Sequence, residues 1–506
     1  MYVLALDQST SATKALIFDP AGRVLDRESR DHRQHYPQPG WVEHDAEEIW
    51  QNTLAVLRTV VARHPDKLAE LTCLSLTNQR ETVVVFARGT GRPLHPAIVW
   101  QCRRGDPLCA AHAAAGHEGL IHARTGLTLD AYFSASKLQW LGQNRPDLRA
   151  QLAAGEALIG TIDTYLIYRL TGGRVFATDT TNASRTLLFD LARRRWDDEL
   201  CALWQVPPAA LAEVRDCSAE FGETTLDGTL ARPLPICGVM GDSQASLFAQ
   251  RCFAAGSAKA TFGTGTSVLL NIGEEARIAR GGVLTALAWT HQGRATYAFE
   301  GIITCSAATL TWLRDQLGLI QDVRETEALA RAVADNGGVY LVPAFSGLGA
   351  PHWRESARAA IVGLSAHSDR RHVVRAALEA IAYQLRDVLD AMRAESGVPL
   401  RELRGDGGAT TNAFLMQFVA DLTGVPLRVA THPDFSPLGA AMMGLLGRGR
   451  VPSIAALAAQ PREERLYAPS ASGNTVERLY AGWQHALVQV LAERGSARVG
   501  TGEGAR

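Results

Sequence analysis

Short apolar runs alternate with amphipathic segments along most of the chain. Seven runs rich in β-branched or aliphatic residues have the length of strands, at 3–6, 15–18, 74–76, 83–86, 236–240, 267–272 and 339–342. Between them lie segments in which apolar residues recur at spacings of three and four, which is typical of helices that bury one side. This alternation predicts an α/β fold.

The clearest predicted helix runs from about His372 to Glu395, where the apolar residues form a single stripe. Shorter helical segments are predicted from Ala307 to Leu317, from Asn412 to Leu422 and from Gln244 to Gln250. The last residues, Gly495 to Arg506, are small, polar and aperiodic, so we expect a frayed tail there. Strands and helices are therefore predicted along the chain as far as a C-terminal segment that lacks any periodic pattern.

A turn rich in hydroxyl groups and glycine occurs once in each half of the chain. Residues 7–14 (DQSTSATK) join two predicted strands near the start, and residues 262–267 (FGTGTS) join two more near the middle. Such a turn between antiparallel strands presents backbone N–H and side-chain O–H groups to an anion. Either turn alone is more commonly a plain surface hairpin. The pair predicts two related domains whose turns clamp a polyphosphate.

Length and charge narrow the class of ligand. The 506 residues exceed one ordinary core, so more than one domain is expected. The 51 basic and 52 acidic residues give a net charge of -1, which argues against nucleic acid or an anionic membrane as the main partner and favours a small molecule.

The sequence also indicates a compartment. No stretch reaches the roughly 18 consecutive apolar residues of a spanning helix, and the start lacks the basic and apolar regions of a signal peptide. We therefore expect a cytoplasmic protein without membrane insertion. The eight cysteines are scattered and lack zinc-ligand spacing, so they are interpreted as reduced thiols.

The familiar nucleotide and hydrolase motifs are absent. The chain has no G-x-x-x-x-G-K-[ST] segment, and the G-T-G at 263–265 lacks the third glycine of a dinucleotide fingerprint. It also has no G-x-S-x-G and no H-E-x-x-H. P-loop ATPases, Rossmann dehydrogenases, serine hydrolases and zinc proteases of these types are disfavoured.

A set of ordered segments resembles the FGGY carbohydrate kinases and, within them, the glycerol kinases, from Asp7 to about Gly444. The segments are 36–45 (YPQPGWVEHD), 78–82 (NQRET), 132–134 (YFS), 181–186 (TNASRT), 241–242 (GD), 342–348 (VPAFSGL) and 406–418 (DGGATTNAFLMQF). Each segment alone is weak evidence, but the ordered set is highly specific.

The resemblance implies a fold and a reaction. The fold is α/β, with two actin-like (ribonuclease H-like) ATPase domains flanking a deep catalytic cleft. We place the domain with the polyol and phosphate site at 1–248, the domain with the nucleotide site at 249–494 and the tail at 495–506. The implied reaction transfers the γ-phosphoryl group of ATP to a hydroxyl of a polyol or sugar. A homodimer or homotetramer is the expected assembly.

Two aspartates carry the implied chemistry. Asp242 follows an apolar strand and begins a helical segment, so a helix N-cap is its alternative role. The resemblance implies that it is the catalytic base, which takes the proton of the attacking alcohol. Asp7 ends the first strand, where it could serve only as an Asx-turn residue. The resemblance implies that it helps to hold Mg²⁺, through water.

The resemblance also implies the ATP-binding residues. The phosphates are assigned to the two turns, through Thr10, Ser11, Lys14, Gly263, Thr264 and Gly265. Lys14 stands where glycerol kinases usually carry arginine, so this contact becomes a point charge instead of a fork. The adenosine side is assigned to Ala307, Thr311, Gly408 and Asn412. A turn and a helix cap are the alternative roles of Gly408 and Asn412, and a glycine and a glutamine are usual at the positions of Ala307 and Thr311.

The acceptor is expected beside Arg80 and Glu81. A guanidinium donates hydrogen bonds and a carboxylate accepts them, so the two together can bind a vicinal diol, although an isolated Arg-Glu pair is usually solvated. The resemblance implies a third hydrogen bond from Tyr132 and an apolar wall from Trp100, for which core packing is the alternative.

Three residues depart from glycerol kinases at the acceptor end. Ser243, Ser267 and Cys102 stand where glutamine, phenylalanine and aspartate are usual, and the smaller side chains predict a larger, more polar pocket. The leading hypothesis is ATP- and Mg²⁺-dependent phosphorylation of glycerol to glycerol 3-phosphate. The alternatives are an FGGY kinase for erythritol, erythrulose or a pentulose, and a non-catalytic actin-like nucleotide switch.

Overall fold

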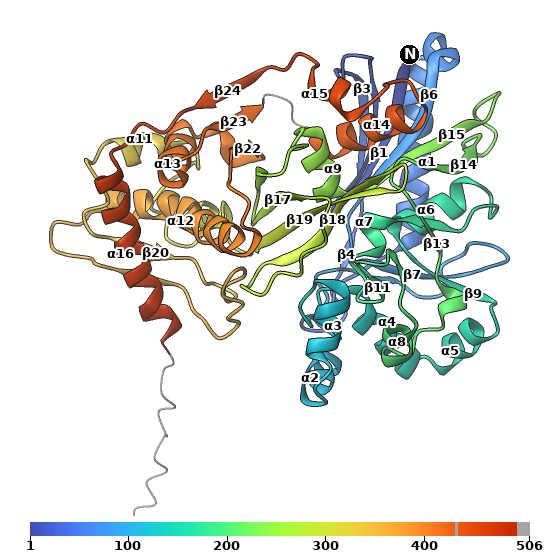
Figure 1. Cartoon of the computed structure of the whole chain (residues 1–506), viewed down its shortest axis with the longest axis horizontal. Coiled ribbons are helices and arrows are strands. Elements are labelled where there is room, and N and C mark those ends of the chain that lie inside the picture. The colour runs from blue at the N-terminus through green and yellow to red at the C-terminus, as the bar shows by residue number, and fades with distance from the viewer. Residues whose placement is uncertain (431–433, 493–506) are drawn as a thin grey trace, which may run out of the picture.

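Two large mixed β-sheets organise the computed structural model, which describes residues 1–430 and 434–492 (Figure 1). The first sheet has the strand order β14-β15-β6-β1-β2-β3. Its strands are β1 (Tyr2–Gln8), β2 (Ala12–Phe18), β3 (Val24–Asp31), β6 (Leu71–Asn78), β14 (Glu220–Thr224) and β15 (Leu234–Gly241). The predicted tail at 495–506 lies outside the described residues.

The second sheet has the order β18-β19-β17-β16-β22-β23-β24. Its strands are β16 (Ser257–Phe262), β17 (Thr266–Gly273), β18 (Leu284–His291), β19 (Arg294–Ile303), β22 (Glu402–Asp406), β23 (Leu427–Ala430) and β24 (Glu464–Tyr467). The predicted strand at 339–342 lies apart, as β20 (Tyr340–Val342) paired with β21 (Ala360–Val362).

The two sheets repeat one topology. In the first, β1 is antiparallel to β2 and parallel to β6, which is parallel to β15, and β14 closes the edge antiparallel to β15. In the second, β16 is antiparallel to β17 and parallel to β22, which is parallel to β23, and β24 closes the edge in the same sense. This repeat confirms the relation that the two similar turns predict.

Each of those turns closes the central hairpin of its sheet. The first joins β1 to β2, with Asp7 opposite Lys14, and the second joins β16 to β17, with Phe262 opposite Thr266. Both turns therefore occupy the same place in the repeated topology. The remaining polar residues of the turns, Ser9 to Ser11 and Gly263 to Gly265, project beyond the ends of the paired strands.

Helices cover the sheets. The first sheet packs against α1 (Ala46–Arg63), α6 (Ile162–Leu170) and α14 (Phe435–Gly447), and α14 also packs on α9 (Asp242–Ala249). The second sheet packs against α12 (Arg370–Ser396), whose neighbours are α10 (Ala308–Asp315), α11 (Glu325–Arg331), α13 (Ala413–Thr423) and α16 (Gly473–Leu491). The long predicted helix thus corresponds to α12, while α10 ends two residues before the predicted Leu317.

A third sheet lies beside the first and has the order β4-β5-β8-β7-β9 (Figure 1). Its strands are β4 (Gln34–His35), β5 (Glu43–His44), β7 (Val83–Ala87), β8 (Ala97–Ile98) and β9 (Ala157–Thr161). Near it lie the helices α2 (Asp106–Ala114), α3 (Glu118–Thr125), α4 (Ser134–Asn144), α5 (Pro146–Ala153) and α8 (Asp198–Leu203). The short helix α7 (Thr180–Ala183) instead contacts β18 and β15 of the two large sheets. The region of the third sheet supplies Trp100, just after β8, and Tyr132, just before α4.

Two further observations concern the whole described chain. Within residues 1–430 and 434–492, no helix is both long enough and apolar enough to cross a membrane. All eight cysteines are buried and carry free thiols.

Candidate active site

Asp242 lies where β15 meets α9. Gly241 is the N-cap of α9 and Asp242 is its first helical residue, so Asp242 is not the helix N-cap. The Oδ1 atom of Asp242 accepts a hydrogen bond from the backbone N–H of Ser243 at 2.6 Å and lies 3.2 Å from Nε of Arg80. The side chain keeps 39% exposure, so an acceptor molecule can reach the carboxylate.

Arg80 and Glu81 form the turn between β6 and β7. Glu81 adopts a φ of 62°, a left-handed conformation that costs a residue with a side chain of the order of 1–3 kcal/mol. The turn is fastened by Thr82, whose backbone N–H donates to the Arg80 carbonyl and whose hydroxyl donates to Gln79. The side chains of Arg80 and Glu81 are both buried. A strained backbone like that of Glu81 is typical of functional sites.

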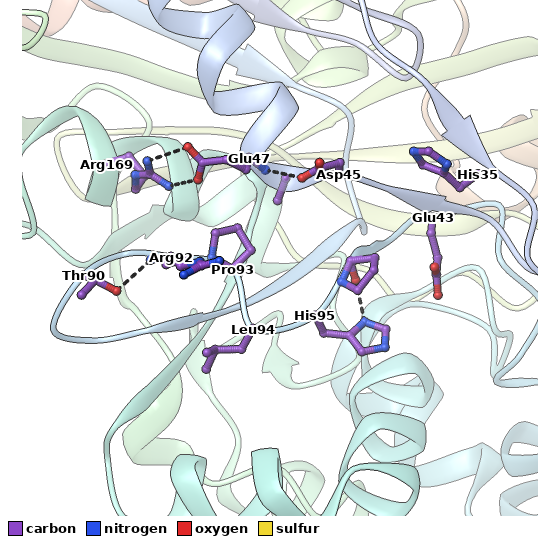
Figure 2. Close-up of a pocket in the computed structure, with 12 residues that line it drawn as sticks. His35, Glu43, Asp45, Glu47, Thr90, Arg92, Pro93, Leu94, His95 and Arg169 are labelled. Atoms are coloured by element: carbon purple, nitrogen blue, oxygen red, sulfur yellow. Dashed lines mark hydrogen bonds and ion pairs between the residues drawn. The ribbon is translucent and has the colours of Figure 1, made fainter.

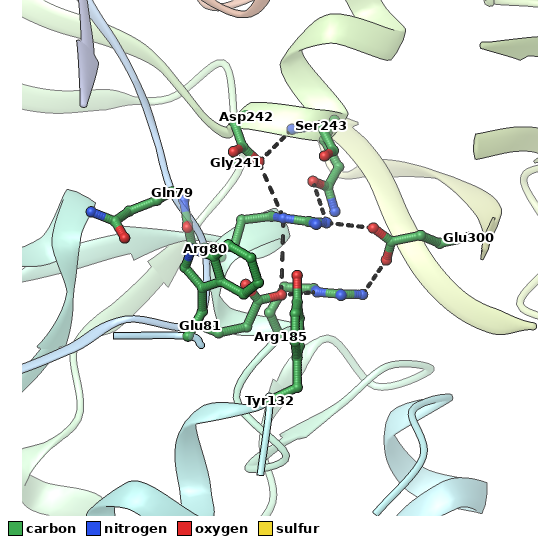
Figure 3. Close-up of polar contacts among 12 residues, drawn as sticks. Gln79, Arg80, Glu81, Tyr132, Arg185, Gly241, Asp242, Ser243 and Glu300 are labelled. Atoms are coloured by element: carbon green, nitrogen blue, oxygen red, sulfur yellow. Dashed lines mark hydrogen bonds and ion pairs between the residues drawn. The ribbon is translucent and has the colours of Figure 1, made fainter. Parts of the chain in front are cut away.

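Two residues without a predicted role complete the surroundings of this pair. Arg185 donates from Nε to Glu81 Oε1 at 2.6 Å and from Nη1 to Glu300, and Arg80 Nη1 lies 2.8 Å from the other oxygen of Glu300 (Figure 3). Arg185 and Glu300 are fully buried. Sequence analysis missed both residues, although an isolated acid inside the apolar run 297–303 (YAFEGII) is itself a signal of a buried charge.

The charges in this network balance one another. Burial acts to raise the pKa of Glu300, but Arg185 and Arg80 outweigh it and hold that pKa below its usual value. Burial raises the pKa of Glu81, opposed by the same two guanidinium groups. A buried charge is tolerated only when it is paired and hydrogen-bonded, and each of these side chains meets that condition.

Tyr132 and Trp100 form the wall beside this network. Their ring centroids are 5.3 Å apart, and both side chains are half-buried, so Trp100 is not simply a core residue. Among the described residues, the Tyr132 hydroxyl makes no hydrogen bond, which leaves it free for a ligand. The indole N–H of Trp100 donates to the Thr10 hydroxyl at 2.9 Å and so ties this wall to the first turn.

Ser243 and Ser267 come together on the other side of Asp242. Their hydroxyl oxygens are 3.4 Å apart, and the buried ammonium of Lys259 lies 3.5 Å from that of Ser267. Burial lowers the pKa of Lys259. Cys102, in contrast, is fully buried in a hydrophobic cluster, where its sulfur accepts from Arg104. Of the three departures, Ser243 and Ser267 therefore lie together next to Asp242, whereas Cys102 is buried elsewhere, and the larger polar pocket stays a prediction.

The first turn places Asp7 opposite Lys14, with 3.7 Å between the carboxylate and the ammonium. Burial raises the pKa of Asp7 to about 6, and the charges of Asp242 and Asp434 add to this effect while Lys14 opposes it. Thr10 and Ser11 lie in the same turn, half-buried and exposed respectively. The turn thus offers hydroxyl groups and one ammonium beside a buried carboxylate.

This carboxylate suits a cation. Neighbouring negative charges disfavour its ionised form, and a divalent ion would relieve that repulsion. Within the described residues, no cluster of three or more acidic, histidine or cysteine side chains has metal-site geometry. Asp7 fits a Mg²⁺ ion that takes few protein ligands and keeps most of its water and phosphate ligands.

The second turn brings three predicted nucleotide residues together. Thr264, Ala307 and Thr311 line one pocket of about 380 Å³, whose remaining lining residues belong to α10 or, in the case of Gln316, follow it directly. The backbone carbonyl of Thr264 accepts from the N–H groups of Ser306 and Ala308, so the turn is hydrogen-bonded to the start of the helix. A pocket at this place has the size and position for part of a nucleotide.

Gly408 lies beside the same turn. A side chain at the preceding Gly407, whose φ is 97°, would meet the backbone oxygen of Phe262 at 2.4 Å, so the two glycine-rich segments are in close contact. Asn412 is the N-cap of α13. Its Oδ1 accepts from Leu415 N–H at 2.9 Å and its Nδ2 donates to Thr326 at 3.2 Å. The cap is present, and a nucleotide contact of Asn412 stays a prediction.

A further cavity of about 900 Å³ is lined by the start of α1, by residues of the segment 90–96 and by Arg169 of α6 (Figure 2). Several of its polar side chains are already engaged: Glu47 pairs with Arg169 at 2.8 Å, Asp45 accepts from the backbone of α1, and His95 contacts the Pro96 carbonyl at 2.7 Å. No predicted site residue lines this cavity, so we do not include it in the candidate active site.

The buried residue His44, which contacts Gln79 next to the Arg80 turn, should make the stability of the fold sensitive to acid. His44 is fully buried, and its Nδ1 lies 3.4 Å from Nε2 of Gln79. Burial lowers its pKa from the usual 6.5 to about 3, with His32 and His35 adding to the effect. Between pH 6.5 and pH 3, His44 is therefore protonated in the unfolded chain and neutral in the folded chain. The free energy of unfolding should therefore fall as the pH is lowered from 6.5, by up to about 5 kcal/mol at pH 3.

The measurement compares the wild type with His44→Asn by denaturant unfolding at several pH values. Asparagine keeps an acceptor near the place of Nδ1 and removes the titrating ring, so the variant should show a shallower loss of stability below pH 6.5. An identical pH dependence in both proteins would mean that His44 titrates normally in the folded state.

Both halves of the chain match one known protein family. Residues 2–249 match the N-terminal domain, and residues 258–447 the C-terminal domain, of the FGGY family of carbohydrate kinases. The chain belongs to this family. Kinases of this class transfer a phosphoryl group from a nucleoside triphosphate, so membership implies the use of ATP.

The FGGY relatives cover nearly the whole chain. This chain is 44% identical to glycerol kinase 1 of Thermotoga maritima over 493 residues, and the aligned region covers 97% of this chain and 100% of that protein. It is 46% identical over 492 residues to glycerol kinase of Rhodospirillum rubrum, with 97% and 99% covered. Glycerol kinase of Plasmodium falciparum, whose crystal structure contains ADP, superposes with a TM-score of 0.92 at 34% identity over 97% and 98% of the two chains. Xylulose kinase of Rhodospirillum rubrum has the same fold, with a TM-score of 0.86 at 24% identity over 97% and 99% of the two chains.

Proposed function

We propose that the protein phosphorylates glycerol to glycerol 3-phosphate with ATP. One observation carries this proposal. The half-exposed carboxylate of Asp242 lies against Arg80, beside Glu81 and the free hydroxyl of Tyr132, so a proton acceptor and diol-binding groups share one site. The similarity to glycerol kinases over nearly the full chain supports glycerol as the acceptor.

In this mechanism Asp242 takes the proton of a terminal hydroxyl as its oxygen attacks the γ-phosphorus. The new O–P bond forms while the bond from that phosphorus to the bridging oxygen of ADP breaks, and ADP leaves with the electron pair. Arg80, Glu81 and Tyr132 hold the other hydroxyls of the acceptor. Lys14 and the backbone of Thr264 neutralise charge on the phosphates from opposite turns.

Asp7 would hold Mg²⁺. Thr10 and Ser11 would bind the terminal phosphates beside Lys14. On the second turn, phosphate would be bound by Gly263, Thr264 and Gly265. A bound Mg²⁺ neutralises phosphate charge during transfer. Ala307, Thr311, Gly408 and Asn412 are the proposed contacts on the adenosine side. These assignments are supported by the shared pocket and by the contact between the two glycine-rich segments.

Acceptor-dependent release of ADP tests the proposal. Purified protein with ATP and Mg²⁺ should release ADP when glycerol is added, and the product should be identified as glycerol 3-phosphate. ATP binding without any polyol-dependent ADP release would favour a nucleotide switch instead. A panel of erythritol, erythrulose and pentuloses in the same assay ranks the possible acceptors.

One observation favours a larger acceptor as a second candidate. Ser243 and Ser267 are small polar residues next to Asp242, and Ser267 also lies beside Lys259. Replacing Ser267 by Phe should therefore shift the ratio of kcat/KM values toward glycerol and away from four-carbon polyols, by about 10- to 200-fold, because the ring fills the space that an extra CHOH unit needs.

Ser267→Ala is the matched control, since it removes the hydroxyl without adding volume and should leave the size preference nearly unchanged. The measurement is the ratio of kcat/KM for glycerol to that for erythritol in all three proteins. If the phenylalanine variant keeps the wild-type ratio, the Ser267 side chain does not border the acceptor.

Compartment, assembly and domain limits are also proposed. We infer that the enzyme works in the cytoplasm, where ATP is available and the buried thiols stay reduced, and that it forms a homodimer or homotetramer. Light scattering during gel filtration measures the assembly. The domain limits 1–248 and 249–494 follow the repeat of the two sheets, and limited proteolysis tests the boundary.

A further inference from the structure

We propose that Arg185 and Glu300 are positioning residues for the acceptor, which fix Arg80 and Glu81 in the orientation needed to bind a vicinal diol. This inference rests on the proposed phosphorylation of glycerol. It assigns a purpose to two buried charges that the mechanism above does not use. Neither residue needs to touch the acceptor for this role.

The four side chains form a closed ring of alternating charge, called here the acceptor ring (Figure 3). Around the ring, Arg80 Nη1 lies 2.8 Å from Glu300, Glu300 pairs with Arg185, Arg185 Nε lies 2.6 Å from Glu81, and Glu81 lies 3.9 Å from Arg80 Nε. Each guanidinium therefore lies between two carboxylates. With exposures of 5% or less, all four side chains are screened from water.

The hydrogen bonds of the ring leave selected atoms unused. Arg80 engages Nη1 with Glu300 and Gln244, and its Nε lies beside Asp242, whereas its Nη2 makes no hydrogen bond to the described residues. Glu81 engages Oε1 with Arg185, and its Oε2 makes none. One donor atom of Arg80 and one acceptor atom of Glu81 thus remain for the hydroxyls of a diol, and their directions are set by the bonds on the far side of each group. Nη2 of Arg185 also makes no hydrogen bond to the described residues, but that atom is fully buried.

The ring also joins the two halves of the fold. Arg80 and Glu81 follow β6 of the first sheet, Arg185 follows α7, and Glu300 lies on β19 of the second sheet. Replacing Glu300 by a neutral residue would leave two buried guanidinium groups with too few carboxylates around them. Arg80 would then lose its fixed direction, and a misplacement of about 1 Å in a reacting complex can cost about 10²-fold.

The test uses Glu300→Gln and two acceptors, glycerol and propane-1,3-diol, which lacks the central hydroxyl. In the wild type, kcat/KM should be far higher for glycerol. In the variant, that ratio should fall by about 10²-fold through loss on glycerol alone, while KM for ATP stays unchanged. A purely structural defect would lower both acceptors equally, and this result would overturn the proposal.

Two further variants keep the test decisive. Glu379→Gln is the matched control, because Glu379 is an equally buried glutamate on α12, paired with Arg375 at 2.7 Å outside the ring, and its loss should leave the acceptor ratio unchanged. Arg185→Lys keeps the charge but not the fork, and it serves if Glu300→Gln does not fold. A wild-type ratio in a folded, active Arg185→Lys protein would also overturn the proposal. Absence of glycerol phosphorylation by the wild type would instead remove the proposed function, and this inference with it.

Discussion

Asp242→Asn is expected to fold and bind ATP normally and to lower kcat by about 10²- to 10⁴-fold, the usual contribution of a positioned base. Asparagine has nearly the same shape, and its oxygen can still accept the hydrogen bond from the Ser243 N–H that the carboxylate accepts now. Its amide, however, cannot take the proton of the attacking hydroxyl. The loss should therefore appear in the chemical step and not in the binding of either substrate.

Single-turnover kinetics and ATP binding measure the two effects separately. Asp198→Asn provides the matched control, because Asp198 is likewise the first residue of its helix, α8, and lies outside the site. The control should keep the wild-type kcat. If Asp242→Asn phosphorylates the best polyol at nearly the wild-type rate, another group is the base.

Arg80→Ala is expected to raise KM for the polyol by about 10²- to 10³-fold and to leave KM for ATP nearly unchanged. Removing one partner of a buried, hydrogen-bonded charge pair costs about 2–5 kcal/mol. Here Glu300, Glu81 and the bound acceptor would each lose their contact with Arg80. The nucleotide residues belong to other segments, so the loss should be confined to the acceptor.

Steady-state kinetics with each substrate varied in turn make the comparison. Arg104→Ala is a suitable control, since Arg104 is also a buried arginine with a carboxylate partner, Glu43, at 2.6 Å. It should lower stability with little effect on either KM. Equal increases in KM for polyol and ATP in Arg80→Ala would assign Arg80 to a different role.

Elements with a strong period were predictable from the sequence. The stripe of α12 and the apolar runs of the strands are visible in the sequence because these elements bury their apolar residues, and the two similar turns predicted the repeat. The two-residue strands β4, β5 and β8 leave no such signal, because their pairing is set by neighbours distant in sequence. The same holds for the place of the third sheet beside the first.

The candidate site divides in the same way. The roles of Asp242, Arg80 and Glu81 were implied by the family resemblance, and all three follow strand ends, where functional groups are expected. Glu300 and Lys259 lie inside strands, and a charged residue there is ordinarily taken to face solvent. The fold shows that both side chains point inward: Glu300 pairs with Arg80 and Arg185 from the other half of the chain, and the Lys259 ammonium donates to Thr261 on its own strand.

The bond from the Trp100 indole to the Thr10 hydroxyl has a consequence for how the enzyme can be dissected. Thr10 belongs to the turn assigned to ATP, and Trp100 is proposed to border the polyol. A substitution at Thr10 that is meant to weaken nucleotide binding will also remove the hydrogen-bond acceptor of the Trp100 indole. The affinities for both substrates will therefore change together. The same bond makes the fluorescence of Trp100 a natural reporter, since filling of either subsite alters the surroundings of one ring.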